Sequence, residues 1–212
     1  MSDNYAKIVR DNLDKLYKNF PDDDLAGTLP ADREGDQFVF EAFGEKCRIG
    51  PEGIILGKEN QAGVTGILIS LYALHASPEP YVPEPLKSFR DFPDSMAYAG
   101  AFATHTEHIL VPHVEKIENA SERIIQQLGG EKAPEKVGGD FSFVIRPLPK
   151  ISLCYIFYKA DDEFPASATC LFSGNALTFM PIDGLADVGE YTSKKIMSIL
   201  GASESGPRKI QT

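Results

Sequence analysis

An eight-residue apolar run that ends in three carboxylates is the strongest constraint on how this chain can fold. Ile151–Tyr158 is almost entirely apolar, which is typical of a buried strand. Asp161-Asp162-Glu163-Phe164-Pro165 follows soon after it. Charge this dense at the end of a buried strand must reach water, a helix N-terminus, a bound cation or a partner. The sequence therefore predicts an acidic turn where the chain leaves its core.

Apolar periodicity and glycine spacing divide the rest of the chain into helices and short strands. We expect helices over residues 4–20, 62–76, about 96–128 with an interruption at Pro112, and 183–200. Strands are expected over residues 38–43, 45–49, 53–57, 86–92, 141–146 and 151–158, with residues 166–172 open between strand and short helix. The three strands between 38 and 57 are short and separated by glycines, which favours an antiparallel meander.

The remaining segments are predicted to lack regular structure. Residues 21–24 and 132–139 are polar and are expected to be loops. Residues 78–85 contain four prolines, which exclude a helix or a central strand and favour an extended segment. The elements follow no regular βαβ alternation, so the predicted fold is a single α+β domain over residues 1–200 with antiparallel strands. Residues 201–212 are expected to be a disordered tail.

Charge and cysteine content exclude several classes of function. The net charge is −10 at pH 7, so we expect no nucleic-acid partner and no anionic membrane. The longest apolar runs fall short of the roughly 20 residues of a spanning helix, and the polar N-terminus has no signal-peptide pattern, so the expected location is cytoplasmic. Cys47, Cys154 and Cys170 form no CxxC pair and are predicted to be buried, reduced thiols.

The acidic turn has several possible roles. In an extended conformation Asp161 and Glu163 point to one face and Asp162 to the other. Two carboxylates on one face can bind Mg²⁺ or Ca²⁺, or act as an acid/base pair. The alternatives are a solvated turn that only shapes the strand exit, and a surface that binds a partner.

Two arginines beside strand-like segments are further candidates. Arg90 and Arg146 can each bind an anionic ligand through two parallel hydrogen bonds. Each can instead form a structural ion pair with an aspartate, such as Asp91, Asp140 or Asp161.

Three histidines lie close together in the sequence. On a continuous helix His105 and His108 share a face, and His113 lies about 80° round from His105. This spacing leaves open a metal or tetrapyrrole site, but exposed or packed helix histidines are the simpler interpretation. No HExxH, GxSxG, phosphate-loop or dinucleotide-binding motif is present.

Several short motifs in the second half resemble those of a known family. They include the segments that begin at Lys87 and Arg146, the acidic turn, and Met180-Pro181-Ile182-Asp183-Gly184. Together, over about residues 35–200, they resemble a prokaryotic family known as domain of unknown function 3786. Some relatives carry a cysteine-rich, iron–sulfur-type segment of the sort found with corrinoid proteins. This chain has no such cysteine cluster, so the resemblance implies a redox or corrinoid role only through a separate partner.

The predicted function is an accessory domain that binds a cofactor, a small ligand, or a redox or corrinoid partner protein, with no particular cofactor indicated. One alternative is an enzyme or divalent-metal-binding protein that uses Asp161 and Glu163 with Arg90 or Arg146. A structural or oligomerisation module is the other alternative.

Overall fold

The first half of the chain forms an antiparallel meander in a computed structural model that describes residues 2–19 and 22–204. Five strands lie side by side in chain order: β1 (Asp32–Glu34), β2 (Gln37–Ala42), β3 (Glu45–Gly50), β4 (Gly53–Leu56) and β5 (Glu59–Asn60). Phe40 pairs with Cys47, and Ile49 pairs with Ile54, so buried side chains of β2, β3 and β4 share one face. The predicted meander is confirmed.

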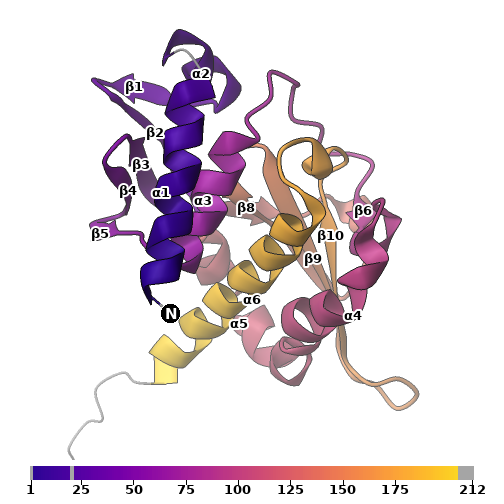
Figure 1. The fold of residues 1–212 in the computed structure, drawn as a ribbon. Coiled ribbons are helices and arrows are strands. Elements are labelled where there is room, and N and C mark those ends of the chain that lie inside the picture. Colours follow the sequence, from indigo (N-terminus) through magenta and orange to yellow (C-terminus); the bar gives the residue numbers. More distant parts are fainter. Residues whose placement is uncertain (1, 20–21, 205–212) are drawn as a thin grey trace, which may run out of the picture.

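Two helices, α1 (Ser2–Asn19) and α3 (Val64–Leu74), lie against this sheet and against each other (Figure 1). Val9, Leu13 and Leu16 recur at helical spacing on α1, and all three are buried. The Asn12 side chain donates a hydrogen bond to Ser70 Oγ on α3 (3.1 Å). The helices predicted over residues 4–20 and 62–76 are therefore confirmed to within two residues at the described ends.

The loop predicted over residues 21–24 is wrong from Asp22 onward. A short helix, α2 (Asp22–Thr28), begins there, while residues 20 and 21 lie outside the described part of the chain. Leu25 and Leu29 are completely buried where this segment meets the core. Burial of these two leucines stabilises the helix, whereas the acidic residues before them suggest a solvated loop.

The second half forms another antiparallel sheet, with β9 (Ile151–Tyr158) at its centre. The strand order is β6–β10–β9–β8–β7, with β6 (Lys87–Ser88), β7 (Gly130–Lys132), β8 (Phe141–Leu148) and β10 (Ser167–Phe172). Every residue of β9 except Tyr158 is buried, as its apolar sequence predicts. Residues 166–172, which the sequence left between strand and helix, supply β10. Antiparallel sheets and packed helices in mixed order confirm the α+β class.

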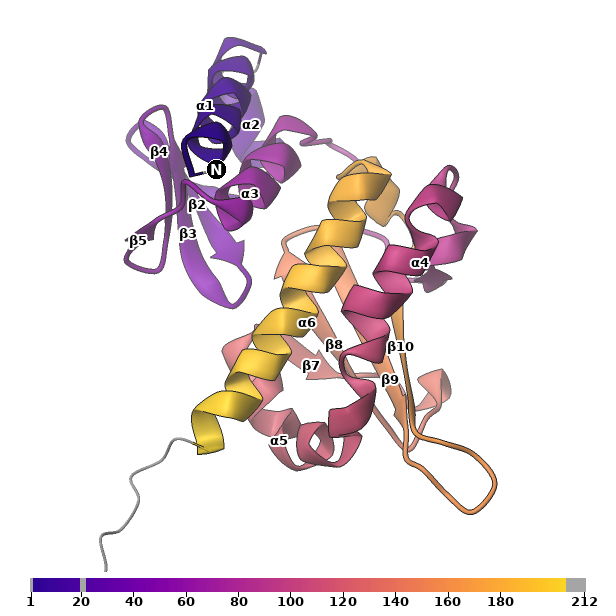
Figure 2. The same ribbon diagram turned by 60° about the horizontal axis from the view of Figure 1, so that its bottom comes forward.

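Helices cover one face of this second sheet. Figure 2 shows α6 (Ile182–Glu204) and α4 (Ala99–Phe102) in front of the strands, with α5 (Val114–Gln127) across one end. The helix predicted over residues 183–200 continues to Glu204, so the start of the predicted tail is helical. The rest of that tail, residues 205–212, lies outside the described residues.

Residues 86–113 depart most from their predicted structure. The strand predicted over residues 86–92 is only the two residues of β6, followed by a 3₁₀ turn, η1 (Phe89–Asp91). Ser88 and Asp91 cap this turn reciprocally through a capping box, which ends the strand. The predicted helix from residue 96 is broken into η2 (Ser95–Ala97), α4, a π-helical turn η3 (Ala103–His108) and η4 (Val111–His113) before α5 begins.

The polar loop predicted over residues 132–139 is also partly ordered. Lys132 belongs to β7, whose residue Gly130 pairs with Ile145, and a 3₁₀ turn, η5 (Glu135–Val137), follows. A side chain at Gly130 would overlap the backbone of β8, so the glycine allows the strands to approach.

The tip of the β2–β3 hairpin joins the two halves. Phe43 N–H donates to Pro147 O (2.7 Å), where an irregularity in β8 interrupts its pairing with β9. The Phe43 ring packs edge-on against Tyr191 of α6 at a centroid distance of 4.7 Å. Glu45 forms an ion pair with Lys195 of α6 (3.0 Å). The buried residues of both halves accordingly form one connected cluster.

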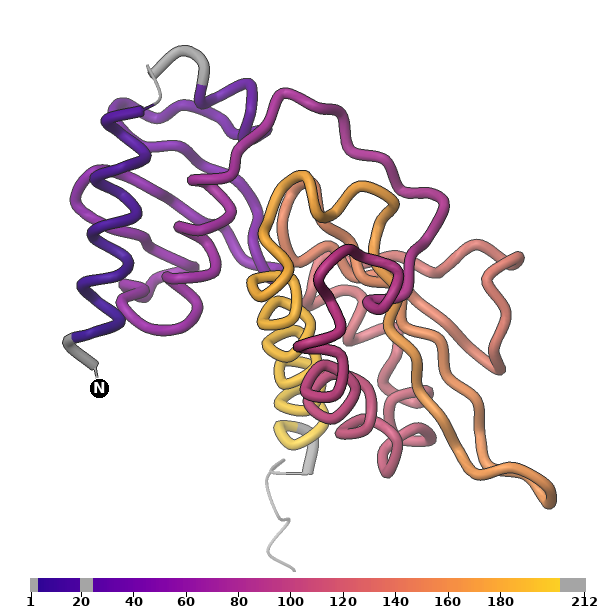
Figure 3. The backbone as a smooth tube through the Cα atoms, turned by 45° about the vertical axis from the view of Figure 1, so that its right-hand side comes forward, coloured from indigo at the N-terminus to yellow at the C-terminus, as the bar shows by residue number. Residues whose placement is uncertain are grey.

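Residues 77–85, which we call the strap, are the chain connection between the halves. The strap crosses the top of the molecule in Figure 3. Lys150 is buried and its Nζ donates to the carbonyls of Ser77 (2.6 Å) and Glu79 (3.0 Å). Asn175 bonds the backbone of the strap twice, accepting from Val82 N–H and donating to a proline carbonyl. As predicted, the proline-rich segment contains neither a helix nor a strand.

Candidate functional site

The acidic turn connects β9 to β10 and is the orange loop that extends from the body in Figure 1 and Figure 3. Asp161 Oδ1 accepts the backbone N–H groups of Glu163 (2.8 Å) and Phe164 (2.6 Å). Asp161 N–H in turn donates to Phe164 O (2.9 Å). The two N–H groups stabilise the ionised carboxylate and lower the pKa of Asp161. Asp161 therefore fixes the shape of the turn.

The other side chains of the turn face solvent. Asp162, Glu163 and Phe164 are exposed, and the relative solvent accessibility of Phe164 is 66%. Tyr158, at the end of β9, is also exposed. In the described part of the chain, no hydrogen bond or ion pair involves the carboxylates of Asp162 or Glu163. The turn thus presents an aromatic ring beside two carboxylates.

The base of the turn is fixed to the body at Lys159. Its backbone N–H donates to Asp140 Oδ2 (2.6 Å), and its Nζ lies 2.8 Å from Glu118 Oε1 on α5. The hydrogen bond to Glu118 raises the pKa of Lys159 above its usual value. These contacts attach the end of β9 to the residue before β8 and to α5, just before the turn projects away.

The structure does not assemble the turn into a cation site. Asp161 turns its carboxylate inward on the loop backbone, whereas the Glu163 carboxylate has no such contact. Across residues 2–19 and 22–204, no group of three or more His, Cys, Asp or Glu side chains is arranged to hold a metal ion.

The two candidate arginines lie apart from the acidic turn. Arg90 is an exposed residue of η1, and its charge acts on Glu107 of η3. Arg146 projects from β8, where its guanidinium lies 5.0 Å from the Tyr81 ring centroid and 4.0 Å from Glu131. The ion pairs proposed with Asp91, Asp140 or Asp161 are not among the contacts of the described residues.

A small cavity lies beside Arg146. Its volume is about 220 Å³, and its lining consists of Gly129, Gly130, Glu131, Val144 and Arg146. The Tyr81 ring stacks on the guanidinium and holds it in place by a cation–π contact. The cavity thus has one arginine, with the Glu131 carboxylate near it, beside two glycines.

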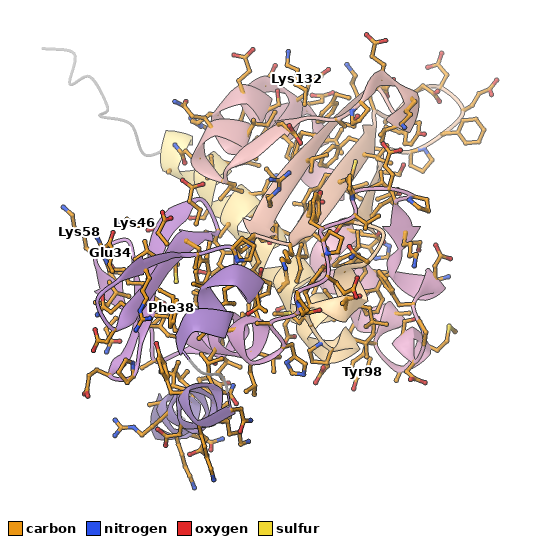
Figure 4. All side chains as sticks on the ribbon, turned by 90° about the horizontal axis from the view of Figure 1, so that it is seen from above. Glu34, Phe38, Lys46, Lys58, Tyr98 and Lys132 are labelled. Atoms are coloured by element: carbon orange, nitrogen blue, oxygen red, sulfur yellow. The ribbon has the colours of Figure 1, made fainter. Side chains whose placement is uncertain are left out.

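A larger and more open cavity lies beside α2 and the first two strands. Its volume is about 530 Å³, and its floor includes Val39 and Phe40. Glu34 of β1 and Lys46 of β3 form an ion pair of 3.1 Å beside it, and Figure 4 shows the two residues close together in the first sheet. The Lys46 ammonium lowers the pKa of Glu34.

The three histidines do not converge. His105 and His108 are exposed on η3, and His113 is half-buried at the end of η4. The angular spacing expected for an α-helix does not apply to them, because η3 is π-helical and η4 is 3₁₀.

Sequence reasoning missed a buried polar cluster beneath η3. Glu107 Oε1 accepts the backbone N–H of Cys170 on β10 (3.0 Å). The Tyr155 hydroxyl lies 3.1 Å from Ser193 Oγ, and Ser193 donates to the Thr106 carbonyl (2.8 Å). Burial raises the pKa of Glu107, opposed by the Cys170 hydrogen bond and by the charges of His108 and Arg90. In the sequence, Glu107 is only one acidic residue within a predicted helix, and such residues are too common to indicate a site.

The three cysteines are buried and free, as predicted. Burial raises the pKa of Cys47 to about 12 and that of Cys154 to about 11. It also raises the pKa of Cys170 well above its usual value. Thiolates are the reactive form, so none of these side chains is poised as a nucleophile.

Comparison with protein families identifies the chain. A family model described as domain of unknown function (DUF3786) matches residues 23–195. The chain belongs to this family. The match confirms the resemblance carried by the short motifs and begins before residue 35, so it includes the whole N-terminal meander, β1 to β5. Comparison with curated proteins and with solved structures gives no match. In the described residues, no helix has the length and apolar character needed to cross a membrane.

Proposed function

We propose that this DUF3786 chain is an accessory domain that binds a partner protein through its acidic turn. The observation that carries the proposal is that one residue of the turn orders the backbone while its neighbours remain exposed. Asp161 holds the backbone, which leaves Asp162, Glu163 and Phe164 exposed on a loop that projects from the body. An exposed aromatic ring beside uncommitted charges is typical of a binding surface.

The chemistry of the turn defines the partner it fits. Carboxylates at Asp162 and Glu163 fit a basic surface, and the Phe164 ring fits an apolar slot or stacks on an arginine. The net charge of −10 steers such a partner toward the chain at low salt. A redox or corrinoid protein is the partner class that the family resemblance implies.

A photocrosslinking amino acid at position 164 tests the proposal in cells of the source organism. The matched control places the same amino acid at Glu52, an exposed residue of the β3–β4 turn. We expect one dominant protein adduct from position 164 that is absent from position 52. The adduct protein, once purified, should bind the wild-type chain and lose about tenfold or more in affinity with Asp162→Lys/Glu163→Lys.

Three outcomes would count against partner binding at the turn. They are identical adducts from both positions, an affinity unchanged by the charge reversal, and an adduct with a second copy of this chain. The last would favour the oligomerisation module instead.

The cavity beside Arg146 favours a second candidate function, binding of a small anionic ligand. The guanidinium is held by Tyr81 and borders a glycine-lined space of about 220 Å³. Arginine in such a setting suits a carboxylate or phosphate group. We expect inorganic phosphate to raise the melting temperature of the wild type but not of Arg146→Gln. Arg48→Gln, which changes an arginine elsewhere, is the control, and an equal shift in all three proteins would reject the site.

A further inference from the structure

Partners on two other elements hold consecutive residues of the π-helical turn η3. Ser193 of α6 donates its hydroxyl hydrogen to the Thr106 carbonyl, and Cys170 of β10 donates its N–H to Glu107. A π-helical turn is uncommon and occurs mostly where function or packing requires it. Here the two side contacts fix the turn between α6 and β10.

Glu107 substitutes for a missing strand neighbour. β6 pairs only with Leu171 and Phe172 at the outer edge of β10. The next residue, Cys170, directs its N–H outward to the Glu107 carboxyl. One side chain from η3 therefore satisfies the edge of the sheet where β6 ends.

The Thr106 hydroxyl lacks a hydrogen-bond partner among the described residues. Its Oγ1 atom is also buried. It is pressed toward α6 at Gly189, where an added Cβ would lie 3.1 Å from Oγ1. An unsatisfied buried hydroxyl destabilises this packing of η3. An alternative conformation of the turn is therefore closer to it in free energy than it would be if the hydroxyl were hydrogen-bonded.

We propose that the Thr106–Glu107 step is a proton-linked latch, closed over the edge of β10 when the Glu107 carboxyl is neutral and released toward solvent when that carboxyl ionises. The latch is independent of partner binding at the acidic turn. It concerns only how firmly η3 covers β10.

The direction of the linkage follows from the surroundings of the carboxyl. The titratable or charged groups that act on Glu107, or on which it acts, are Arg90 of η1, His108 of η3, Tyr155 of β9 and Cys170 of β10. From α6 and α4 the turn meets Gly189, the Ser193 hydroxyl and the Phe102 ring, which carry no charge.

Burial outweighs both the Cys170 hydrogen bond and the charges of His108 and Arg90, so the pKa of Glu107 in the closed state lies above its ordinary value of 4.5. The closed state thus binds the proton more tightly than a released, solvated state. Closure is favoured at low pH and is lost as pH rises from the ordinary value through the raised pKa.

Hydrogen exchange at the Cys170 amide tests the latch. In the wild type we expect the protection factor to fall as pH rises from about 4.5, by at most about tenfold per pH unit for one proton. In Glu107→Gln the side chain stays neutral and still accepts the N–H, so protection should be high and flat with pH. Glu115→Gln, at an exposed position of α5, should behave like the wild type.

The latch would be overturned by flat or rising protection in the wild type, or by a pH dependence that persists in Glu107→Gln. A chemical-shift titration of the Glu107 carboxyl carbon in the wild type provides a second measurement if the variant fails to fold. A pKa at or below 4.5 would also reject the proposal.

Discussion

Asp161 illustrates how one side chain shapes a functional loop. Its carboxylate accepts two backbone N–H groups and so orders three following residues without help from the body of the protein. Its neighbours Asp162 and Glu163 are left to solvent. Within a run of three carboxylates, position in the turn therefore separates a structural role from a binding role.

Asp161→Ala should loosen the turn, whereas Asp162→Ala should not. We expect the amides of Glu163 and Phe164 to exchange several-fold faster in Asp161→Ala at neutral pH. Because the pKa of Asp161 is lowered, its contribution is present above its ordinary pKa and is lost as pH falls through the lowered value. The wild-type turn should thus resemble the variant only once the pH has fallen through that lowered pKa. Equal exchange in both variants at neutral pH would contradict the assignment.

Gly44 is the residue on which the junction between the halves depends. Its φ is +79°, and an added Cβ would overlap the carbonyl oxygen of Gln127 at the end of α5. We expect Gly44→Ala to lower the free energy of unfolding by about 2–4 kcal/mol, from backbone strain and overlap together. Gly27→Ala is the control: no atom lies within 4 Å of its added Cβ, so urea unfolding should show little loss or a small gain.

The sequence predicts some site residues well and others not at all. It locates the exposed carboxylates of the acidic turn because dense charge beside an apolar run is a local signal. It cannot locate Glu107, whose importance depends on Cys170, 63 residues away in the chain. The place of Arg146 on a predicted strand makes it a candidate, but its cavity and its contact with the Tyr81 ring arise only in three dimensions.

At the level of elements, periodic segments were predictable and the irregular ones were not. Apolar spacing predicts the helices α1, α3 and α6 and the long strands β8 and β9. It does not predict η3, because the contacts of η3 with α6 join segments that are far apart in the sequence. Gly189 lets Thr106 and Phe102 approach the helix, and Ser193 binds the Thr106 carbonyl.

Gly189→Ala should therefore disturb the packing of η3 on α6. Its Cβ would lie 2.6 Å from Phe102 Cε2 and 3.1 Å from Thr106 Oγ1. We expect the free energy of unfolding in urea to fall by about 1–3 kcal/mol. Gly201→Ala, in the last turns of the same helix, adds a Cβ with nothing within 4 Å and should be neutral or stabilising by about 0.5–1 kcal/mol. Equal effects at the two positions would contradict the packing.

At the scale of the whole molecule, we propose that the two halves unfold as one domain. The connected core and the hairpin tip at Phe43 link the sheets, and the single domain predicted from the sequence rests on that link. The three buried thiols report on both halves, since Cys47 lies in the first sheet and Cys154 and Cys170 in the second.

Thiol labelling in increasing urea tests whether the two halves unfold together. We expect Cys47 and Cys154 to become reactive at the same urea concentration. Phe43→Ala should lower that concentration for both, with a loss of about 3–5 kcal/mol in the free energy of unfolding. Separate transitions for the two thiols in the wild type would show that the halves are independent domains.

The strap changes what a protease can reveal about this protein. Proteases usually find domain boundaries by cutting exposed, flexible connections. Here Lys150 and Asn175 bind the backbone of the connection, and each of its glutamates, Glu79 and Glu84, precedes a proline that resists cleavage. A glutamate-specific protease should cut at exposed sites such as Glu163 but spare the strap, so the absence of a cut between the halves would reflect a protected linker as well as the cohesion of the core.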